Sequence, residues 1–394
     1  MSSRSPQAVV TGLGAVSPFG RGVGPLWDGL VAGRKALRNI TLFPTEGLRS
    51  PLGGEVPGYP PPAAPGDPSR AERFLADALA EALAGAGIRP GGFDPSRAAL
   101  VIGTNFGGMS AAEKALSPGG APSLAGYDFA GIAARAAAGC GLAGSVAAPS
   151  VSCASGAAAL VVALELIRSG RADLAVAAGY DELSLYCLAG LSALHAVSPG
   201  DITPFDLKRA GTVFSEGAGA LVVEGAESAA KRGASALCEL AGGAANNDAY
   251  HLTAPEKEGR GIVRLMRAAL ADAGVAPEQV DGVNLHGTGT KYNDLIETKA
   301  LKEVFGAHAR RLVLTANKSM LGHTMGAAGA HESVAAVRSL VEGVVPPTVG
   351  ITTPDPECDL DYCPAQARRV ELRVMLKNSY GIGGVNASVV FKKS

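Results

Sequence analysis

The stretch Ser152–Ala159 reads SCASGAAA, and the stretch Gly322–Gly329 reads GHTMGAAG. In each stretch a reactive residue, Cys153 or His323, stands three positions before a glycine that opens a helix of small residues. Each stretch also follows a run that is typical of a strand. The repeated design predicts a chain built from two similar halves. In such a chain the strand ends of both halves would bring Cys153, His323 and a second histidine, His286, to one place.

Short apolar runs alternate with alanine-rich helical stretches along the whole chain. Of its 394 residues, 47% are hydrophobic and 18% are charged, which is enough apolar material for a large buried core. Short apolar strands separated by helices predict an α/β fold in layers around largely buried sheets. The predicted strands are Ala8–Val10, Ala99–Ile102, Leu174–Ala178, Ala220–Val223, Gly282–Leu285, Arg311–Leu314 and Ala387–Phe391. The proline- and glycine-rich segment Pro51–Pro68 is expected to cross the surface.

Several classes of function are excluded by composition. The net charge is −1 and no basic run is present, so nucleic-acid binding is not expected. The N-terminus lacks the apolar core of a signal peptide, and no uninterrupted apolar run reaches the roughly 18 residues of a membrane span. The six cysteines form no CxxC pair, so neither a metal site nor a disulfide framework is expected. A cytoplasmic protein is therefore predicted.

Cys153 is the first candidate for chemistry. The stretch Gly156–Ile167 has apolar residues at the spacing of a buried helix face, which places Cys153 at or just before the helix start. There the unpaired amides and the helix dipole favour a thiolate, so a depressed pKa and selective alkylation of this cysteine are expected. A plain buried cysteine in a tight turn is the alternative.

His286 lies in a loop that reads HGTGT from position 286 to 290. Two glycines directly after a strand let the backbone approach a ligand closely, and the hydroxyls of Thr288 and Thr290 can bond the amides of that ligand. The alternative is a histidine that only caps a turn.

Lys318, His323 and Glu332 form a third group. A lysine and a histidine five positions apart in a small-residue loop can make a cationic patch, which suits negative charge that develops on a thioester oxygen. Glu332, at a helical distance, would hold Lys318 charged by a salt bridge. A solvated ion pair is the alternative for these two residues.

The glycine-rich loop Asn378–Asn386 is the fourth group. Gly381, Gly383 and Gly384 flank Ile382 between two strand-like runs. Such a loop can present a backbone amide to an oxyanion and can move, although a tight hairpin is an equal interpretation. One cysteine nucleophile, two histidines and this loop form a coherent set for thioester chemistry, in which a thiolate accepts an acyl group. The histidines would then stabilise the enolate that decarboxylation of a malonyl thioester leaves.

Taken together, these groups make the sequence resemble the β-ketoacyl-acyl-carrier-protein synthases of the type I/II kind, within the thiolase-like superfamily. The resemblance covers nearly the whole chain, and its motifs occur in the family's order. They are Val9–Pro18, the helix after Cys153, Pro204–Asp206 with Arg209, Ser215–Gly219, Asp248–Pro255, His286–Thr290, Lys318–Glu332 and Asn378–Asn386.

The resemblance implies a five-layer α-β-α-β-α fold made of two duplicated halves, which we place at residues 1–240 and 241–394. It implies Cys153 as the nucleophile, with His286 and His323 activating decarboxylation. Lys318 would support His323 through a network that includes Glu332. The expected reaction is decarboxylative Claisen condensation, an acyltransferase (3-oxoacyl-acyl-carrier-protein synthase) activity of fatty-acid or polyketide elongation.

The same resemblance implies how substrates are held. Thr288 and Thr290 would bind the phosphopantetheine arm of an acyl carrier protein, and Gly381 and Gly383 would contact the substrate. The amides of Cys153 and Ile382 would form the oxyanion hole. No cofactor of the enzyme's own and no metal are expected. The partners implied are the carrier protein and a second identical chain, or alternatively a chain-length-factor-like subunit.

Departures from the family pattern lie around the acyl pocket. Ile382 stands where a gating phenylalanine is usual, Thr212 where a phenylalanine is common, and Asn293 replaces a glycine. They indicate a shift of substrate, with a specialised polyketide or secondary-metabolite synthase as the natural hypothesis. Two alternatives stay open: a non-catalytic partner like a chain-length factor, against which the retained cysteine and histidines argue, and an acyltransferase or thioesterase that does not condense.

Overall fold

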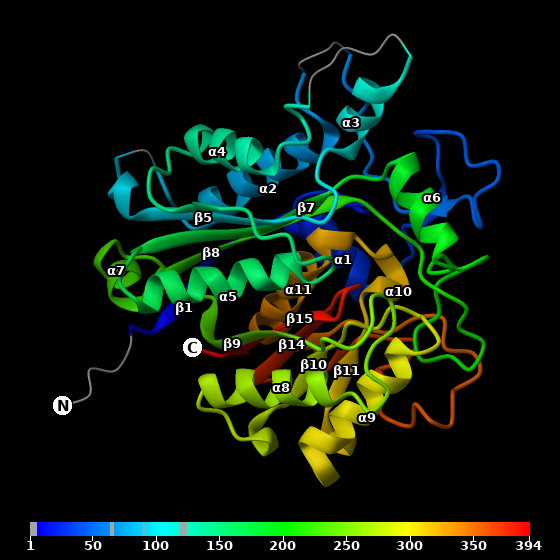
Figure 1. Cartoon of the computed structure of the whole chain (residues 1–394). Helices are drawn as coiled ribbons and strands as arrows, with labels where there is room; N and C mark the ends of the chain where they lie inside the picture. The colour runs from blue at the N-terminus through cyan, green and yellow to red at the C-terminus, as the bar shows by residue number, and fades with distance from the viewer. Residues whose placement is uncertain (1–5, 64–66, 90, 119–123) are drawn as a thin grey trace.

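The main sheet has eleven strands in the computed structural model, which describes residues 6–63, 67–89, 91–118 and 124–394 (Figure 1). The order across it is β11-β10-β14-β15-β9-β1-β8-β7-β5-β6, with β2 paired to β1. The strands are β1 (Ala8–Ser17), β2 (Gly20–Arg21), β5 (Ala98–Gly103), β6 (Val146–Ala147), β7 (Leu174–Asp181), β8 (Gly217–Gly225), β9 (Cys238–Asn247), β10 (Gly282–Asn284), β11 (Val313–Thr315), β14 (Val374–Tyr380) and β15 (Val385–Lys392).

The strands form two sets of five with the same pairing pattern. In the first set, β1 pairs antiparallel with β8, β8 antiparallel with β7, and β7, β5 and β6 run parallel. In the second set, β9 pairs antiparallel with β15, β15 antiparallel with β14, and β14, β10 and β11 run parallel. The sets join where Val9 and Val10 pair with Glu239 and Cys238. The structure thus has the predicted duplicated design, and the division that we propose at 240/241 falls within β9.

The predicted strands are present because their apolar runs are covered on both faces. All six residues of β5 and all eight of β7 are buried, as expected for strands that lie between helical layers. Two-residue strands form two further pairs, β3 (Arg38–Asn39) with β4 (Leu52–Gly53) and β12 (Val344–Val345) with β13 (Arg368–Arg369).

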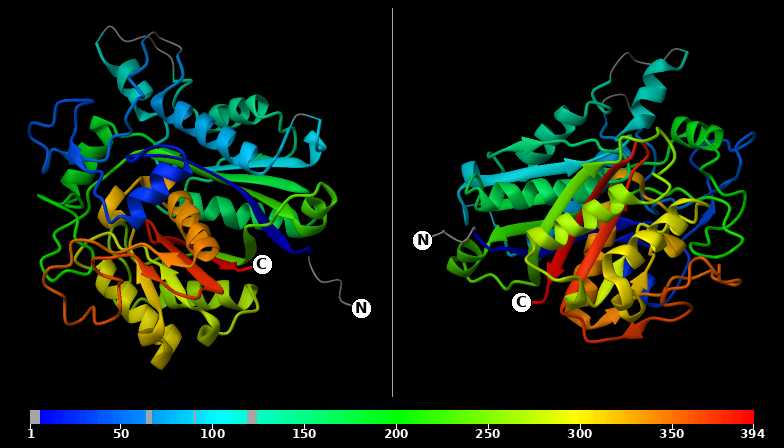
Figure 2. Two further views of the ribbon diagram at one scale, coloured as in Figure 1. Left: turned by 180° about the vertical axis from the view of Figure 1, so that it is seen from behind. Right: turned by 60° about the horizontal axis from the view of Figure 1, so that its bottom comes forward.

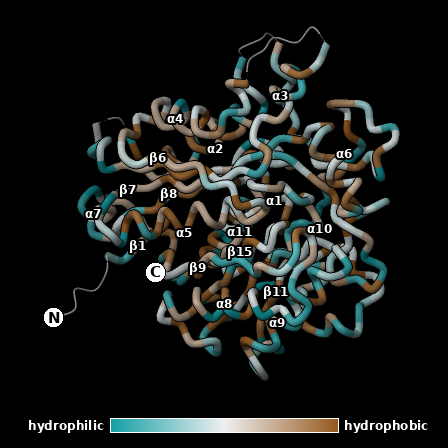
Figure 3. The backbone as a smooth tube through the Cα atoms, in the orientation of Figure 1, coloured by the Kyte–Doolittle hydropathy of each residue, from teal (hydrophilic) through white to brown (hydrophobic). Residues whose placement is uncertain are grey.

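Helices cover and separate the two sets of strands in five layers. The outer helices α2 and α4 pack on the first set, α8 packs on the second set, and α5 and α11 lie between the two (Figures 1 and 2). In Figure 3 hydrophobic residues follow α5 and the strands near it. The helices are α1 (Val23–Val31), α2 (Arg70–Gly85), α3 (Met109–Leu116), α4 (Phe129–Gly139), α5 (Ser155–Arg168), α6 (Leu185–Ala193), α7 (Ala226–Lys231), α8 (Arg260–Asp272), α9 (Asn293–Phe305), α10 (Lys318–Leu321) and α11 (Ala328–Glu342).

The starts of the two central helices pack backbone against backbone. A Cβ atom at Gly156 would lie 2.7 Å from the nitrogen of Ala330, and one at Gly329 would lie 2.4 Å from the nitrogen of Ala157. Only glycine permits so close an approach. The crossing therefore places the turn before α5, with Cys153, beside the turn before α11, with His323.

The prediction for Pro51–Pro68 is wrong in part. Residues 53–56 are buried, whereas Pro51 and several of the residues after Val56 reach the surface. Glu55 accepts the backbone N–H of Leu42 at 2.9 Å, and the N–H of Val56 donates to Glu216 at 2.9 Å, so polar partners in the core hold this piece of chain inside. Residues 64–66 of the segment lie outside the described residues.

Among the described residues, no helix is both long enough and apolar enough to cross a bilayer.

Candidate active site

Cys153 lies in a tight elbow directly before α5, as predicted. Ser152 has a φ of 53°, a left-handed conformation that is uncommon for a residue with a side chain. The hydroxyl of Ser155 supports this turn: it accepts the N–H of Val151 at 2.9 Å and donates to the carbonyl of Ser152 at 2.6 Å. Strain held by surrounding hydrogen bonds is common at functional sites. The side chain of Cys153 is 5% exposed.

The expected depression of the Cys153 pKa is wrong in sign. Burial raises the pKa of this thiol above its ordinary value and outweighs the lowering by the Ser152 hydroxyl, the charge of Lys318 and the backbone N–H of Ile382. A helix start lowers a thiol pKa only where its dipole exceeds the desolvation of the thiolate. Burial therefore favours the neutral thiol form of the resting sulfur.

His286 lies in the loop that follows β10, and its backbone is held by a buried carboxylate. Glu297 of α9 accepts the N–H groups of His286 and Gly287, each at 2.9 Å. The ring turns to Lys318, whose Nζ lies 3.3 Å from its Nδ1 and donates to the His286 carbonyl at 2.7 Å. Lys318 therefore bonds to His286, whereas it acts on His323, which it was expected to support, through its charge. The imidazole of His286 is thus part of a buried polar network, which the turn-cap alternative does not require.

The threonine loop is shaped by glycines and by a second buried carboxylate. Gly287 and Gly289 have φ values of 43° and 73°, and the hydroxyls of Thr288 and Thr290 lie 3.0 Å apart. Asp294 accepts the N–H of Thr288 at 3.1 Å. The Asn293 amide, one of the departures from the family pattern, donates to the same carboxylate at 3.1 Å.

His323 lies perpendicular to His286, with ring centroids 5.5 Å apart and an interplanar angle of 85°. Its ring stacks on Phe214 at 5.5 Å, and its Nδ1 accepts the N–H of Met325 at 3.1 Å. The residues on either side of Phe214 hold the His323 backbone: the N–H of His323 donates to the Val213 carbonyl at 2.8 Å, and its carbonyl accepts the N–H of Ser215 at 2.9 Å.

Both imidazoles are neutral hydrogen-bond donors in this arrangement. Burial, followed by the charge of Lys318, holds the pKa of His286 and of His323 well below the usual range. Each Nδ1 accepts a hydrogen bond, from the Lys318 amine in one ring and from the Met325 amide in the other. The single hydrogen of each neutral ring therefore lies on Nε2. Two such donors can stabilise an oxyanion without acting as bases.

Lys318 and Glu332 are a buried ion pair and not the solvated pair that was the alternative. Their side chains are 1% and 2% exposed, and Nζ lies 2.5 Å from Oε1 of Glu332. A second lysine, Lys377 of β14, lies 2.8 Å from Oε2 of the same carboxylate and is 0% exposed. The polar cluster therefore has two ammonium groups on one carboxylate.

The glycine-rich loop is the turn of the β14–β15 hairpin, and it also reaches the cysteine. Tyr380 pairs with Asn386 at the end of the hairpin, which agrees with the hairpin alternative. Gly383, with a φ of 95°, donates its N–H to the Leu252 carbonyl at 2.7 Å. The backbone N–H of Ile382 nevertheless lies close enough to the sulfur of Cys153 to act to lower the pKa of the thiol.

Sequence reasoning missed Lys377, Glu297, Asp294 and Phe214. A signal existed for Lys377, because a lysine in the apolar run of Val374–Leu376 has to be paired when the strand is buried. Glu297 and Asp294 bind backbone N–H groups of a loop that precedes them, which spacing alone does not reveal.

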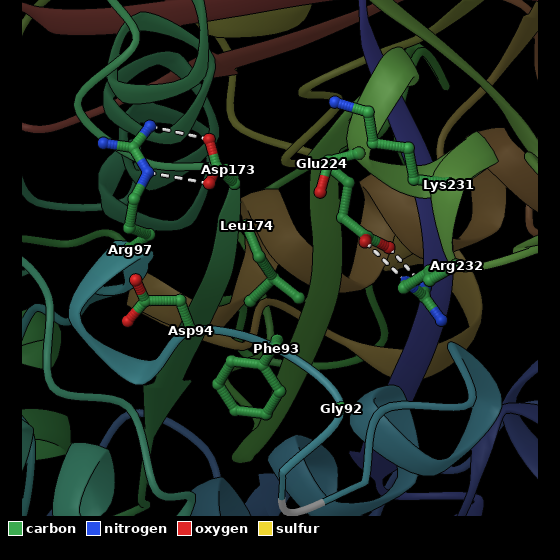
Figure 4. Close-up of a pocket in the computed structure, with 10 residues that line it drawn as sticks. Gly92, Phe93, Asp94, Arg97, Asp173, Leu174, Glu224, Lys231 and Arg232 are labelled. Carbon is green, nitrogen blue, oxygen red and sulfur yellow. Dashed lines mark hydrogen bonds and ion pairs between the residues drawn. The ribbon is translucent and has the colours of Figure 1, made fainter.

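Two other cavities lie away from this site. One is lined by charges that pair with one another, Arg97 with Asp173 and Arg232 with Glu224 (Figure 4). The other is an apolar groove of about 440 Å³ between α2 and α4. In the described residues, no group of three or more His, Cys, Asp or Glu side chains is arranged to hold a metal ion.

A buried thiol at a helix start, two neutral imidazole donors and an amide close to the sulfur define an acyl-transfer enzyme of the thiolase-like fold. Comparison with known families agrees with this geometry. Residues 6–229 match the family described as "Beta-ketoacyl synthase, N-terminal domain", and residues 237–352 match "Beta-ketoacyl synthase, C-terminal domain". The chain belongs to the beta-ketoacyl synthase family, whose members condense acyl groups in fatty-acid or polyketide elongation.

Individual relatives match over the whole length. The chain is 35% identical to 3-oxoacyl-[acyl-carrier-protein] synthase 2 of Synechocystis sp., over 98% of each protein. Among solved structures, a type II polyketide ketosynthase in complex with its acyl-carrier protein and bound to the hexaketide is 33% identical with a TM-score of 0.93, over 99% of this chain and 100% of that one. The ishigamide ketosynthase/chain length factor is 34% identical with a TM-score of 0.93 over the same shares.

Proposed function

We propose that this chain joins an acyl group on Cys153 to a malonyl-type unit on an acyl carrier protein, with loss of CO2. The observation that supports this proposal most directly is the pair of neutral Nε2–H donors of His286 and His323, 5.5 Å apart between ring centroids, in a cluster whose charge also acts on Cys153. These donors are additional to the backbone amides proposed for the transfer step, and they suit the enolate oxygen that decarboxylation creates.

In the first half-reaction the sulfur of Cys153 attacks the carbonyl carbon of an acyl thioester on the carrier. The new S–C bond forms as the bond to the phosphopantetheine sulfur breaks, and the thiol proton leaves with that sulfur. The N–H groups of Cys153 and Ile382 hold the oxyanion of the tetrahedral intermediate.

In the second half-reaction the phosphopantetheine arm of the malonyl carrier occupies the site that the arm of the acyl carrier has left. The bond to the malonyl carboxylate breaks, CO2 leaves, and the electron pair forms an enolate whose oxygen accepts hydrogen bonds from His286 and His323. The enolate carbon then attacks the acyl carbonyl on Cys153, and the thiolate leaves and is protonated. Lys318, held by Glu332, keeps the His286 ring in the orientation that presents Nε2–H.

The roles of the flanking loops follow from their positions. Thr288 and Thr290, with hydroxyls 3.0 Å apart beside His286, would bond the amides of the phosphopantetheine arm. Gly381 and Gly383 leave room for that arm beside Ile382. The enzyme needs no cofactor besides the arm that its substrates carry. An acyl carrier protein is the partner, with a second identical chain or a chain-length-factor-like subunit beside it, and the proposed compartment is the cytoplasm.

A specialised acyl substrate, in polyketide or related biosynthesis, is the more specific proposal. Ile382 packs in an apolar cluster with Phe106, Phe214 and Met325 next to the sulfur. The side chains of this cluster determine how much room an acyl group finds beyond Cys153. Replacement of a gating phenylalanine by isoleucine changes that room while the cysteine and both histidines are retained.

Mass spectrometry of the purified protein with a panel of acyl-carrier thioesters and malonyl carrier tests the function. We expect an acyl adduct on Cys153, followed on malonyl addition by release of CO2 and a carrier-bound product longer by two carbons. An adduct that is only hydrolysed or transferred would assign the chain to acyl transfer without condensation. No adduct with any thioester would support the role of a non-catalytic partner subunit.

A further inference from the structure

Lys377 has no function in the reaction described so far, yet it lies at the centre of the protein. It is on β14, between β10 and β15, and its side chain is 0% exposed. Its amine donates to the Asn378 carbonyl and to the Ser379 hydroxyl, the latter at 3.0 Å, and lies 2.8 Å from Oε2 of Glu332. A buried ammonium group is retained only where such partners compensate its desolvation.

Glu332 connects this lysine to the catalytic groups. Its second oxygen, Oε1, lies 2.5 Å from Lys318, and Lys318 lies 3.3 Å from Nδ1 of His286. A carboxylate held at one oxygen can rotate about its terminal bond, whereas one held at both oxygens cannot. The ion pair with Lys377 therefore restricts the rotation of Glu332 and helps to fix the Lys318 amine, which also donates directly to the His286 carbonyl at 2.7 Å.

We propose that Lys377 is a positioning residue for the decarboxylation step: it holds the second oxygen of Glu332, fixes Lys318 against His286, and adds a charge that favours the neutral form of both imidazoles. This inference rests on the proposed function, because it assigns Lys377 to one of its two half-reactions. The hydrogen bonds of Lys377 to the loop of Ile382 go to its first two residues, Asn378 and Ser379, which belong to β14 and precede Ile382. Acyl loading should therefore depend on Lys377 less than CO2 release does.

The effect of the Lys377 charge on the two histidines follows from the groups that face Lys377. These are Glu332 of α11, Lys318 of α10, Glu297 of α9 and the two catalytic histidines. The charge of Lys377 contributes to lowering the pKa of both histidines. Burial lowers the pKa of Lys377 itself to about 8, although Glu332 opposes this effect. Lys377 therefore loses its charge within the working range of an assay.

The test compares Lys377→Met, Lys377→Arg and a matched control, Lys392→Met, whose lysine is half-buried on the neighbouring strand and 3.9 Å from Glu239. CO2 release from malonyl carrier and acyl loading of Cys153 are measured separately from pH 5.5 to 9.5. For Lys377→Met we expect a fall in kcat for CO2 release of about ten- to a hundredfold, the size that misplacement of a catalytic group produces. Acyl loading and the KM for malonyl carrier should change less than about twofold, as expected when ground-state binding is kept.

The pH profile separates positioning from plain structural support. Loss of the Lys377 charge raises the histidine pKa values, so the acid limb of CO2 release should move to higher pH in Lys377→Met. In the unaltered enzyme the rate of CO2 release should change its dependence on pH near pH 8, and this change should be absent in Lys377→Met. Lys377→Arg, which stays charged, should restore the acid limb and lack the change near pH 8, and Lys392→Met should behave like the unaltered enzyme.

Two results would overturn the inference. One is an equal loss of loading and CO2 release at every pH, with an unmoved acid limb. The other is a Lys377→Met enzyme that releases CO2 as fast as the unaltered one. Failure of the proposed function is recognised separately, because the unaltered enzyme would then release no CO2 from malonyl carrier.

Discussion

The two sets of strands have the same pairing, but they bury opposite charges beside the active site. β7 ends at Asp181, a fully buried carboxylate that accepts the N–H groups of Phe106 at 2.8 Å and Gly326 at 2.5 Å. Its counterpart β14 contains Lys377, a fully buried ammonium group on Glu332. Burial raises the pKa of Asp181 to about 6 and lowers that of Lys377 to about 8.

The difference shows how two halves with the same strand pairing can take different parts in the proposed reaction. The carboxylate of the first set ties its loop to Gly326, and so to the turn that follows His323, and that half carries Cys153, the proposed nucleophile. In the proposed reaction the second set would supply the imidazole donors, and the buried cations Lys318 and Lys377 lie near them. The shared strand pairing brings strand ends and helix starts together, and different side chains on the two counterpart strands give the two halves different charges.

Replacing the nucleophile should separate the two halves most sharply. Cys153→Ala is expected to reduce condensation by about 10⁴-fold or more, as loss of a covalent nucleophile does. It should keep CO2 release from malonyl carrier, because the donors belong to the other half. Product formation and CO2 release, measured in one assay, check this division. Residual condensation at a few per cent would disprove the assignment of Cys153.

Removing the shared carboxylate should affect folding more than any surface change. Glu332→Gln leaves two buried lysines without a counter-charge and is expected to lower the free energy of unfolding by about 3–5 kcal/mol. Glu342→Gln is the control on the same helix, since its pair with Arg338 is partly exposed and should contribute at most about 1 kcal/mol. Urea unfolding of both variants gives the comparison, and equal stability would show that the buried cluster is not held by Glu332.

Removing either donor should impair only the second half-reaction. His286→Ala and His323→Ala are each expected to lower the rate of CO2 release by about 10²- to 10³-fold, the size measured for a lost oxyanion donor. Loading of Cys153 should change by a few-fold at most. His195→Ala, an exposed histidine that contacts Arg49, is the control. A similar fall in loading would contradict the division of work.

A substitution of Ile382, which stands where a gating phenylalanine is usual, should alter the selectivity for acyl groups without abolishing acyl transfer. Ile382→Phe adds an aromatic ring to the apolar cluster of Phe106 and Phe214. We expect the ratio of kcat/KM for long and short acyl carriers to change by about 10- to 200-fold, the range that hydrophobic pockets achieve. Transfer of a short acyl group should fall much less. An unchanged acyl range would remove position 382 from the selectivity determinants.

The smallest effect concerns the resting thiol. Since burial raises the pKa of Cys153 above its ordinary value, the thiolate fraction should still be rising at pH 9. Alkylation of Cys153 by iodoacetamide should therefore increase by close to tenfold per pH unit between pH 7 and 9, followed by peptide mass spectrometry. A plateau below pH 8 would mean that the dipole of α5 outweighs burial.

The sequence predicted most of what local pattern determines. The alternation of apolar runs and helices predicted the layers, and the repeated spacing around Cys153 and His323 predicted the duplication that the mirrored strand pairing shows. The helix predicted at Gly156–Ile167 extends one residue further at each end. The cysteine, both histidines, Lys318, Glu332 and the Ile382 loop lie in one region of the protein. Their catalytic roles remain proposals.

Long-range burial explains what the sequence could not reveal. The sign of the Cys153 pKa depends on how completely other segments cover the sulfur, which no local motif records. The inward path of Glu55 and Val56 depends on partners far along the chain, including Glu216. The second cation on Glu332 appears only when β14 is placed against α11. Local reasoning therefore identified the reacting groups and missed the groups that hold them.

The crossing of α5 and α11 makes the enzyme sensitive at positions that take no part in its chemistry. A single methyl group at position 156 would require the two backbones to separate, and that displacement would be transmitted to the sulfur on one side and to an imidazole on the other. The distance between the sulfur and the imidazole is thus determined where the backbones of α5 and α11 are in direct contact. Changes that broaden the acyl range can accumulate around the pocket, whereas this contact has to be preserved for any acyl group to react.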